Sequence, residues 1–151
     1  ALASMRPRLA QAGIDVDTTG LDALAAQGAA QPAPLVRGDA QQLHQVFLNL
    51  LENSLRYTDA GGLLRIAARV LPPADGAPQL QVQLDDSAPG VPAHELPRIF
   101  DRFYQGDTSH SEEGNGLGLA LVKRVVDLVE GTITAESEPG KGAIFTVILK
   151  L

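Results

Sequence analysis

The chain contains no cysteine. This absence excludes disulfide bonds, zinc sites built from thiolates and cysteine nucleophiles, and it fits a reducing compartment such as the cytoplasm. Basic residues are also scarce, because Lys and Arg total 12 against 18 Asp and Glu, which gives a formal net charge of -6. No general positive field attracts nucleic acid or anionic lipid, so any phosphate that binds must be held locally.

Long apolar runs are missing as well. No stretch approaches the ~18 consecutive apolar residues of a membrane span, and the first residues lack the charged start and apolar run of a signal peptide. We therefore expect no membrane contact by this chain. The 151 residues, of which 44% are apolar, suffice for one domain with a single hydrophobic core.

Two segments have the apolar periodicity of strong helices. Residues 40–58 place leucines and Phe47 at spacings of three and four, directly after Asp39, which is a good N-cap residue. Residues 119–130 repeat this periodicity behind a glycine cluster. Residues 1–12 are typical of the end of a further helix.

Alternating apolar residues predict strands at residues 14–16, 63–70, 79–84, 132–137 and 143–149. The last two form a hairpin. Two other segments are less regular: we expect a loop or short helix at residues 21–34 and a short helical segment at residues 94–103. The sum predicts an α/β (α+β) two-layer sandwich, with a mixed sheet of about five strands and about three helices on one face.

A polar strip runs along the first strong helix. Asn49, Asn53, Arg56 and Tyr57 are spaced so that they share one face beside the apolar stripe. An asparagine carbonyl can bind Mg²⁺ where phosphates supply the negative charge, and arginine forms charge-assisted bonds to phosphate. Seen alone, such a strip is equally typical of the solvated flank of an amphipathic helix.

The glycine cluster GNGLG, residues 114–118, opens directly into the second strong helix. Unhindered backbone there can approach a ligand, while the free N–H groups and the helix dipole favour an anion. The spacing differs from the dinucleotide fingerprint, and no Lys-Ser or Lys-Thr follows as in a phosphate loop. The alternative is a flexible connector.

Asp86 stands at the end of the strand at residues 79–84 and begins the turn DSAPGVP. A carboxylate at this place can accept a hydrogen bond from an exocyclic amine such as that of adenine, with Val91 as an apolar wall. An ordinary surface turn is the alternative. Three histidines, His44, His94 and His110, have no supporting constellation and are expected at the surface.

In order along the chain, four segments resemble the motifs of the ATP-binding domains of bacterial sensor histidine kinases. NLLENSLRYT (residues 49–58) resembles the N box, and DSAPGVP (residues 86–92) resembles the first glycine box. FDRFY (residues 100–104) resembles the F box, and GNGLGLALV (residues 114–122) the second glycine box. The order and spacing of all four make the resemblance specific.

The resemblance implies the Bergerat-type ATP-binding fold, with ATP and Mg²⁺ as cofactors and residues 105–115 as a lid. Asn53 would coordinate Mg²⁺, Arg56 would contact phosphate oxygens and Asp86 would accept the adenine amino group. The positions that the resemblance and the motifs assign to nucleotide binding are Asn49, Asn53, Arg56, Tyr57, Asp86, Ala88, Gly90, Val91, Phe103, Tyr104, Gly114, Asn115, Gly116, Leu117, Gly118, Leu119 and Thr146.

Three positions depart from the family pattern. Ala88 replaces the first glycine of D-x-G-x-G, and Gln105 stands where arginine is frequent, so a lid cation is missing there. Asn49 occupies the position at which gyrase-like relatives carry a glutamate base, which disfavours activation of water. Asn49 and Gln105 are therefore the candidate catalytic positions, and transfer to histidine is expected to exceed hydrolysis.

The acceptor motif, a histidine followed by an acidic residue and Arg-Thr-Pro or similar, is absent from the sequence. We expect residues 1–12 to be a remnant of the dimerisation helix or linker and residues 13–151 to be the catalytic domain. The implied partners are the parent kinase's own dimerisation domain and, through the full kinase, a response regulator; nucleic acid is not expected. The implied location is the cytoplasmic portion of an inner-membrane sensor kinase.

Two alternatives in function remain open from the sequence. Ala88 and Gln105 are compatible with a non-catalytic nucleotide-binding or docking module, which would bind ATP without transferring phosphate. A serine kinase or ATPase of the same superfamily is the second alternative. The missing glutamate at position 49 argues against the ATPase.

Overall fold

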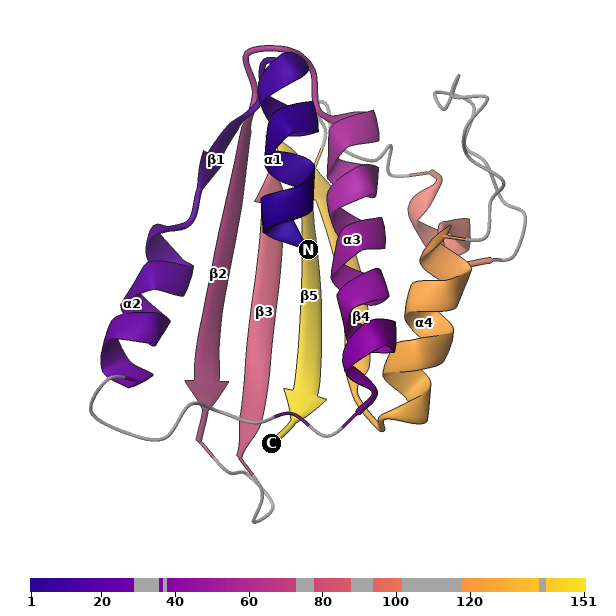
Figure 1. The fold of residues 1–151 in the computed structure, drawn as a ribbon. Coiled ribbons are helices and arrows are strands. Elements are labelled where there is room, and N and C mark those ends of the chain that lie inside the picture. The colour runs from indigo at the N-terminus through magenta and orange to yellow at the C-terminus, as the bar shows by residue number, and fades with distance from the viewer. Residues whose placement is uncertain (29–35, 37, 73–77, 88–93, 102–117, 139–140) are drawn as a thin grey trace.

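The described strands form one five-stranded mixed sheet in the order β1-β2-β3-β5-β4 (Figure 1). The computed structural model describes residues 1–28, 36, 38–72, 78–87, 94–101, 118–138 and 141–151. Only β1 and β2 pair in parallel; the other neighbours are antiparallel. The strands are β1 (Asp15–Asp17), β2 (Leu63–Leu71), β3 (Gln79–Asp86), β4 (Thr132–Glu138) and β5 (Gly142–Lys150).

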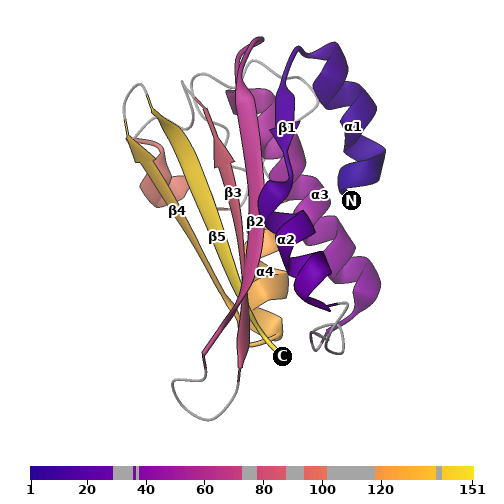
Figure 2. The same cartoon turned by 90° about the vertical axis from the view of Figure 1, so that its left-hand side faces the viewer.

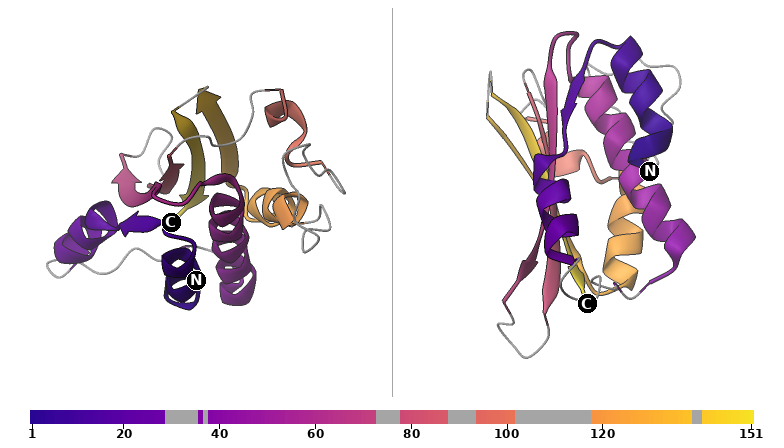
Figure 3. Two further views of the ribbon diagram at one scale, coloured as in Figure 1. Left: turned by 90° about the horizontal axis from the view of Figure 1, so that it is seen from above. Right: turned by 60° about the vertical axis from the view of Figure 1, so that its left-hand side comes forward.

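Helices cover one face of this sheet and leave the other bare (Figures 2 and 3). The covering helices are α1 (Leu2–Gln11), α3 (Ala40–Tyr57) and α4 (Gly118–Leu128). Helix α2 (Thr19–Gly28) lies instead at the sheet edge, beside the part of β2 that extends past the short β1. The expected two-layer sandwich with three helices on one face is confirmed. None of the described helices is long and apolar enough to cross a membrane.

Local sequence explains the start of helix α3 and the two faces of the sheet. The carboxylate of Asp39 accepts hydrogen bonds from the backbone N–H groups of Gln41 and Gln42, so it caps α3 as predicted. In the strands, alternate residues such as Leu84 and Phe145 are buried under the helices. Their neighbours along each strand point to the bare face, because side chains alternate with a period of two.

Helix α1 is packed into the same core as the rest of the domain. Met5 and Leu9 are 2% and 0% exposed and belong to the continuous cluster of buried apolar residues. Gly13 ends the helix with a φ of 74°, a backbone conformation that suits glycine. That residues 1–12 also derive from a dimerisation helix stays a prediction.

The segment expected to be helical at residues 94–103 forms less helix than the sequence suggested. Among its described residues, only the three-residue 3-10 turn η1 (Leu96–Arg98) is helical. Pro97 lies in the first turn, where its missing N–H group is tolerated, so it does not by itself account for the short length. The segment at residues 21–34 contains a helix, α2, in its first part, and residues 29–35 lie outside the described residues.

Candidate nucleotide-binding site

The polar strip of α3 faces the interior rather than solvent. Asn49, Asn53 and Tyr57 are 9%, 5% and 9% exposed, and their spacing of four places them one above the other on the helix. A solvated flank would be exposed, so the burial excludes that alternative for these three residues. Arg56 differs, because its side chain is exposed at the end of the same helix.

Asn49 connects α3 to the beginning of α4. Its Nδ2 donates a hydrogen bond of 3.1 Å to the carbonyl oxygen of Gly118, the first residue of α4. Its Oδ1 accepts one of 2.7 Å from Nε2 of Gln45, one turn earlier. The bond to Gly118 joins α3, which carries the N box, to the part of the second glycine box at which α4 begins.

Asp86 is a fully buried carboxyl at the end of β3. Its Oδ1 accepts a hydrogen bond of 3.0 Å from the backbone N–H of Ala143 on β5, which lies opposite it in the sheet register. Its Oδ2 has no hydrogen-bond partner of standard geometry. Burial raises the pKa of Asp86 to about 6, against the lowering effects of the Ala143 N–H and the nearby Ser54 hydroxyl.

The raised pKa of Asp86 predicts a loss of stability between about pH 4 and pH 6. In that interval the folded state binds the Asp86 proton more strongly than the unfolded state does, so the free energy of unfolding falls as the pH rises. The shift from 3.8 to about 6 corresponds to on the order of 2 to 3 kcal/mol. Urea unfolding at several pH values measures this fall in the free energy of unfolding. In Asp86→Asn, the part of the fall that comes from Asp86 is expected to be absent. An identical pH dependence in wild type and Asp86→Asn would contradict it.

Four buried polar atoms on α3, on Thr58 directly after it and on β3 have no hydrogen-bond partner of standard geometry: Asn53 Nδ2, Ser54 Oγ, Thr58 Oγ1 and Asp86 Oδ2. Each such atom costs free energy unless a ligand or solvent satisfies it. Ser54 lies near Asp86, since its hydroxyl lowers the pKa of that carboxyl. These orphaned groups fit a polar ligand held between the two elements.

Sequence reasoning missed Ser54, Thr58 and Ala143 as parts of this site. Ser54 is on α3 and Thr58 directly follows the helix, with its N–H bonded to the Ser54 carbonyl oxygen. The third contribution is a backbone N–H group, which the residue type does not reveal. Only the register of β3 against β5 places it beside Asp86.

The sequence predicts Thr146 at the nucleotide site, whereas the structure turns its side chain to the face of the sheet opposite that of Asp86. Its neighbour in the register is Gln83, whose Nε2 donates a 3.4 Å hydrogen bond to the Thr146 hydroxyl. Asp86 is three residues from Gln83 along β3, so the two side chains lie on opposite faces of the sheet. Thr146 therefore lies on the bare face, and Ala143 is the β5 residue opposite Asp86.

Other predicted positions cannot be placed. Those outside the described residues are Ala88, Gly90, Val91, Phe103, Tyr104, Gln105, Gly114, Asn115, Gly116 and Leu117. His110 is also among them, whereas His44 and His94 are exposed as expected. Of the F box, Phe100 packs edge-on against the buried Phe145, with ring centroids 6.4 Å apart.

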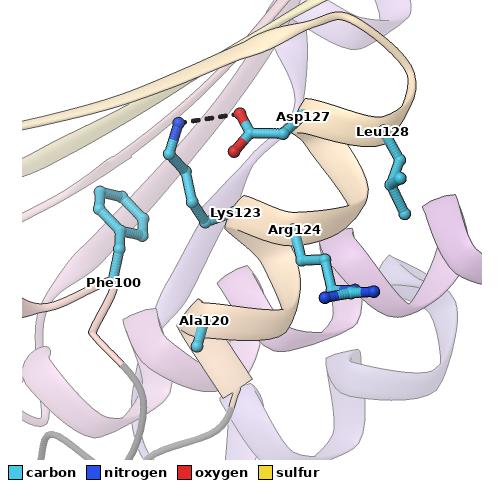
Figure 4. Close-up of a pocket in the computed structure, with 6 residues that line it drawn as sticks. All are labelled: Phe100, Ala120, Lys123, Arg124, Asp127 and Leu128. Atoms are coloured by element: carbon cyan, nitrogen blue, oxygen red, sulfur yellow. Dashed lines mark hydrogen bonds and ion pairs between the residues drawn. The ribbon is translucent and has the colours of Figure 1, made fainter.

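A hollow of about 440 Å³ lies beside α4, and neither Asp86 nor the polar strip of α3 lines it (Figure 4). Its lining residues are Phe100, Ala120, Lys123, Arg124, Asp127 and Leu128. Lys123 and Asp127 form an ion pair at 2.9 Å. None of its lining residues carries an orphaned buried polar atom, unlike the group around Asp86.

Solved structures similar to this chain include histidine kinases. The mycobacterial sensor histidine kinase MprB superposes with a TM-score of 0.75 at 25% identity, over 99% of this chain and 90% of that chain. Full-length ShkA in complex with AMPPNP superposes with a TM-score of 0.74 at 28% identity, over 97% of this chain and 27% of that chain.

Curated relatives are sensor kinases several times longer than this chain. BaeS of Escherichia coli strain K12 is 42% identical over 118 residues, which cover 77% of this chain and 24% of BaeS. SasA of Synechococcus sp. strain CC9311 is 42% identical over 114 residues, 75% of this chain and 29% of SasA. The similarity to BaeS confirms a likeness that the motifs LLENSLRYTDAGG and DSAPGV predict.

The family model of histidine kinase-, DNA gyrase B- and HSP90-like ATPases matches residues 38–151. The match begins just before the cap of α3 and includes all four motif segments and the closing hairpin. It covers most of the chain, and it agrees with the order of motifs, the sheet topology and the buried Asp86. The chain therefore belongs to this ATPase family, as a domain whose homologues are sensor histidine kinases.

Proposed function

We propose that this chain binds Mg-ATP and donates the γ-phosphoryl group to a histidine on a separate dimerisation domain. The observation that carries the proposal is the buried carboxyl of Asp86, whose Oδ2 has no partner, close to the buried polar strip of α3. A nucleotide offers the groups that this arrangement lacks: amine donors at the base and oxygens at the phosphates.

At the base end, Asp86 recognises adenine. Its Oδ1 is held by the Ala143 N–H, so Oδ2 remains to accept the exocyclic amino group. The hydroxyls of Ser54 and Thr58 are also unpaired and buried, and each can donate or accept at the polar edge of a base. A carboxylate with one fixed oxygen discriminates against bases that present a carbonyl there.

At the phosphate end, α3 and α4 meet. Asn53 offers a carbonyl oxygen, the ligand type that Mg²⁺ takes, and Arg56 is exposed nearby on the same helix to contact phosphate. The N-terminus of α4, at Gly118 and Leu119, brings backbone N–H groups and the positive end of the helix dipole. Bound Mg²⁺ supplies neutralisation of the charge that develops on the phosphates.

Transfer to an acceptor is favoured over hydrolysis by the residue at position 49. Asparagine takes up no proton, and both ends of the Asn49 carboxamide are held, by Gln45 and by Gly118. No general base for water is therefore present at this position. The histidine acceptor and attachment to a membrane are contributed by the remainder of a longer kinase, and the full kinase acts on a separate response regulator.

Calorimetric titration with a non-hydrolysable ATP analogue, with and without Mg²⁺, tests the proposal. We expect binding that strengthens with Mg²⁺, and labelling of histidine when labelled ATP and the separate dimerisation domain are added. No binding at millimolar analogue contradicts nucleotide binding. Binding without labelling would favour the docking module, and acid-stable serine phosphate or steady hydrolysis would favour the serine kinase or ATPase.

Replacing Asn53 by alanine is expected to reduce Mg²⁺-dependent ATP affinity by at least about 10-fold, because an oxygen ligand is removed. Affinity measured without Mg²⁺ should change much less. Gln42→Ala, an exposed position on the same helix, is the matched control. Equal Mg²⁺-dependent gains in affinity for the wild type and Asn53→Ala would show that the metal is held elsewhere.

A further inference from the structure

Gln45 lies one helical turn before Asn49 on α3 and is half-buried. Its Nε2 donates the 2.7 Å hydrogen bond to Asn49 Oδ1, and Asn49 Nδ2 donates the 3.1 Å bond to the Gly118 carbonyl. The two bonds form a continuous relay from α3 to the first residue of α4. Gln45 is not part of the polar strip that the motifs identified.

The direction of this relay is fixed by its last member. A backbone carbonyl only accepts hydrogen bonds, so the Asn49 atom that faces Gly118 must be the donor, Nδ2. Asn49 then presents Oδ1 to residue 45, and residue 45 must be a donor in turn. The assignment of both carboxamides therefore follows from the network rather than from an arbitrary choice of rotamer.

We propose that Gln45 is a positioning residue for phosphate binding, acting through Asn49. By holding Oδ1, it keeps Nδ2 on the Gly118 carbonyl and so fixes the N-terminus of α4 against α3. The inference rests on the proposed nucleotide-binding function. Its consequence is specific: Gln45 affects the phosphate end of the site, at α4, and not the base end at Asp86.

The contacts of the two ends support this division. Asn49 is bonded to Gly118 on α4, whereas Asp86 is held by the Ala143 N–H on β5. Removing the Gln45 donor frees the Asn49 carboxamide to rotate, which loosens the α3–α4 link while the Asp86–Ala143 bond stays intact.

Gln45→Met removes the donor with little change in side-chain length, and Gln41→Met at an exposed position is the matched control. We expect Gln45→Met to weaken binding of Mg-AMP-PNP by roughly 10-fold. Adenosine binding, followed by NMR titration, should be unchanged. Gln45→Lys keeps a donor at this position and should restore affinity to that of Gln41→Lys, which carries the same added charge.

A double-mutant cycle tests whether Gln45 acts through Asn49. In an Asn49→Ala background, Gln45→Met is expected to cause no further loss of Mg-AMP-PNP affinity. If the two substitutions instead weaken binding independently, the relay is overturned. If wild type binds Mg-AMP-PNP and Gln45→Met binds it equally well, the role of Gln45 is overturned and the proposed function stands. If wild type binds no nucleotide, both proposals fail. An equal loss of adenosine and AMP-PNP affinity would indicate a structural role only.

Discussion

Replacing Asp86 by asparagine is expected to weaken ATP binding by about 100-fold and to leave the domain folded. The Ala143 N–H requires an acceptor, so the asparagine carbonyl faces Ala143 and its NH₂ takes the place of Oδ2. A donor then faces the adenine amino group, and the charged acceptor is lost. Folding is expected to persist because the carboxyl is already disfavoured as a buried charge, as its raised pKa indicates.

Asp85→Asn is the matched control for this change. Asp85 precedes Asp86 on β3, and its side chain points to the opposite face of the sheet. Calorimetry should therefore give near wild-type ATP affinity for Asp85→Asn, and thermal unfolding should show that both variants are folded. Comparable ATP affinities for the two variants would refute the role assigned to Asp86.

Alanine at Gly142 is expected to lower the free energy of unfolding by more than about 3 kcal/mol or to prevent folding. Gly142 has a φ of 99°, a conformation that side chains rarely adopt. A Cβ at this position would also overlap the carbonyl oxygen of Asp86 and crowd the backbone of Ser87. The strain thus falls on the junction of β3 and β5 that positions Asp86.

Gly61→Ala separates the backbone strain from the overlap. Gly61 has a φ of 85°, but a Cβ there would meet nothing within 4 Å. We expect Gly61→Ala to lower the free energy of unfolding by only about 1 kcal/mol, which is the strain of a residue with left-handed backbone angles. Urea unfolding of both variants measures the difference. Equal losses would mean that the close approach of Gly142 to Asp86 does not matter.

Local sequence determined most of the elements and the family. Helix α3 follows from its Asp39 cap and apolar periodicity, and the strands follow from alternation, because both signals depend on residues close in the chain. The order of the motifs predicted Asp86 and the α3 asparagines as candidate site residues, because their residue types and spacing carry the resemblance. A short segment such as residues 94–103 gives too weak a signal, and its described residues contain only the turn η1.

Only the tertiary structure decided how these parts meet. The register of β5 against β3 places Ala143 beside Asp86 and turns Thr146 to the bare face, an outcome that a shift of one residue would reverse. Likewise, the hydrogen bond from Asn49 to Gly118 joins residues 69 positions apart. The sequence specifies which groups are available through local periodicity, but burial and orphaned hydrogen-bonding atoms arise only when separate elements pack together.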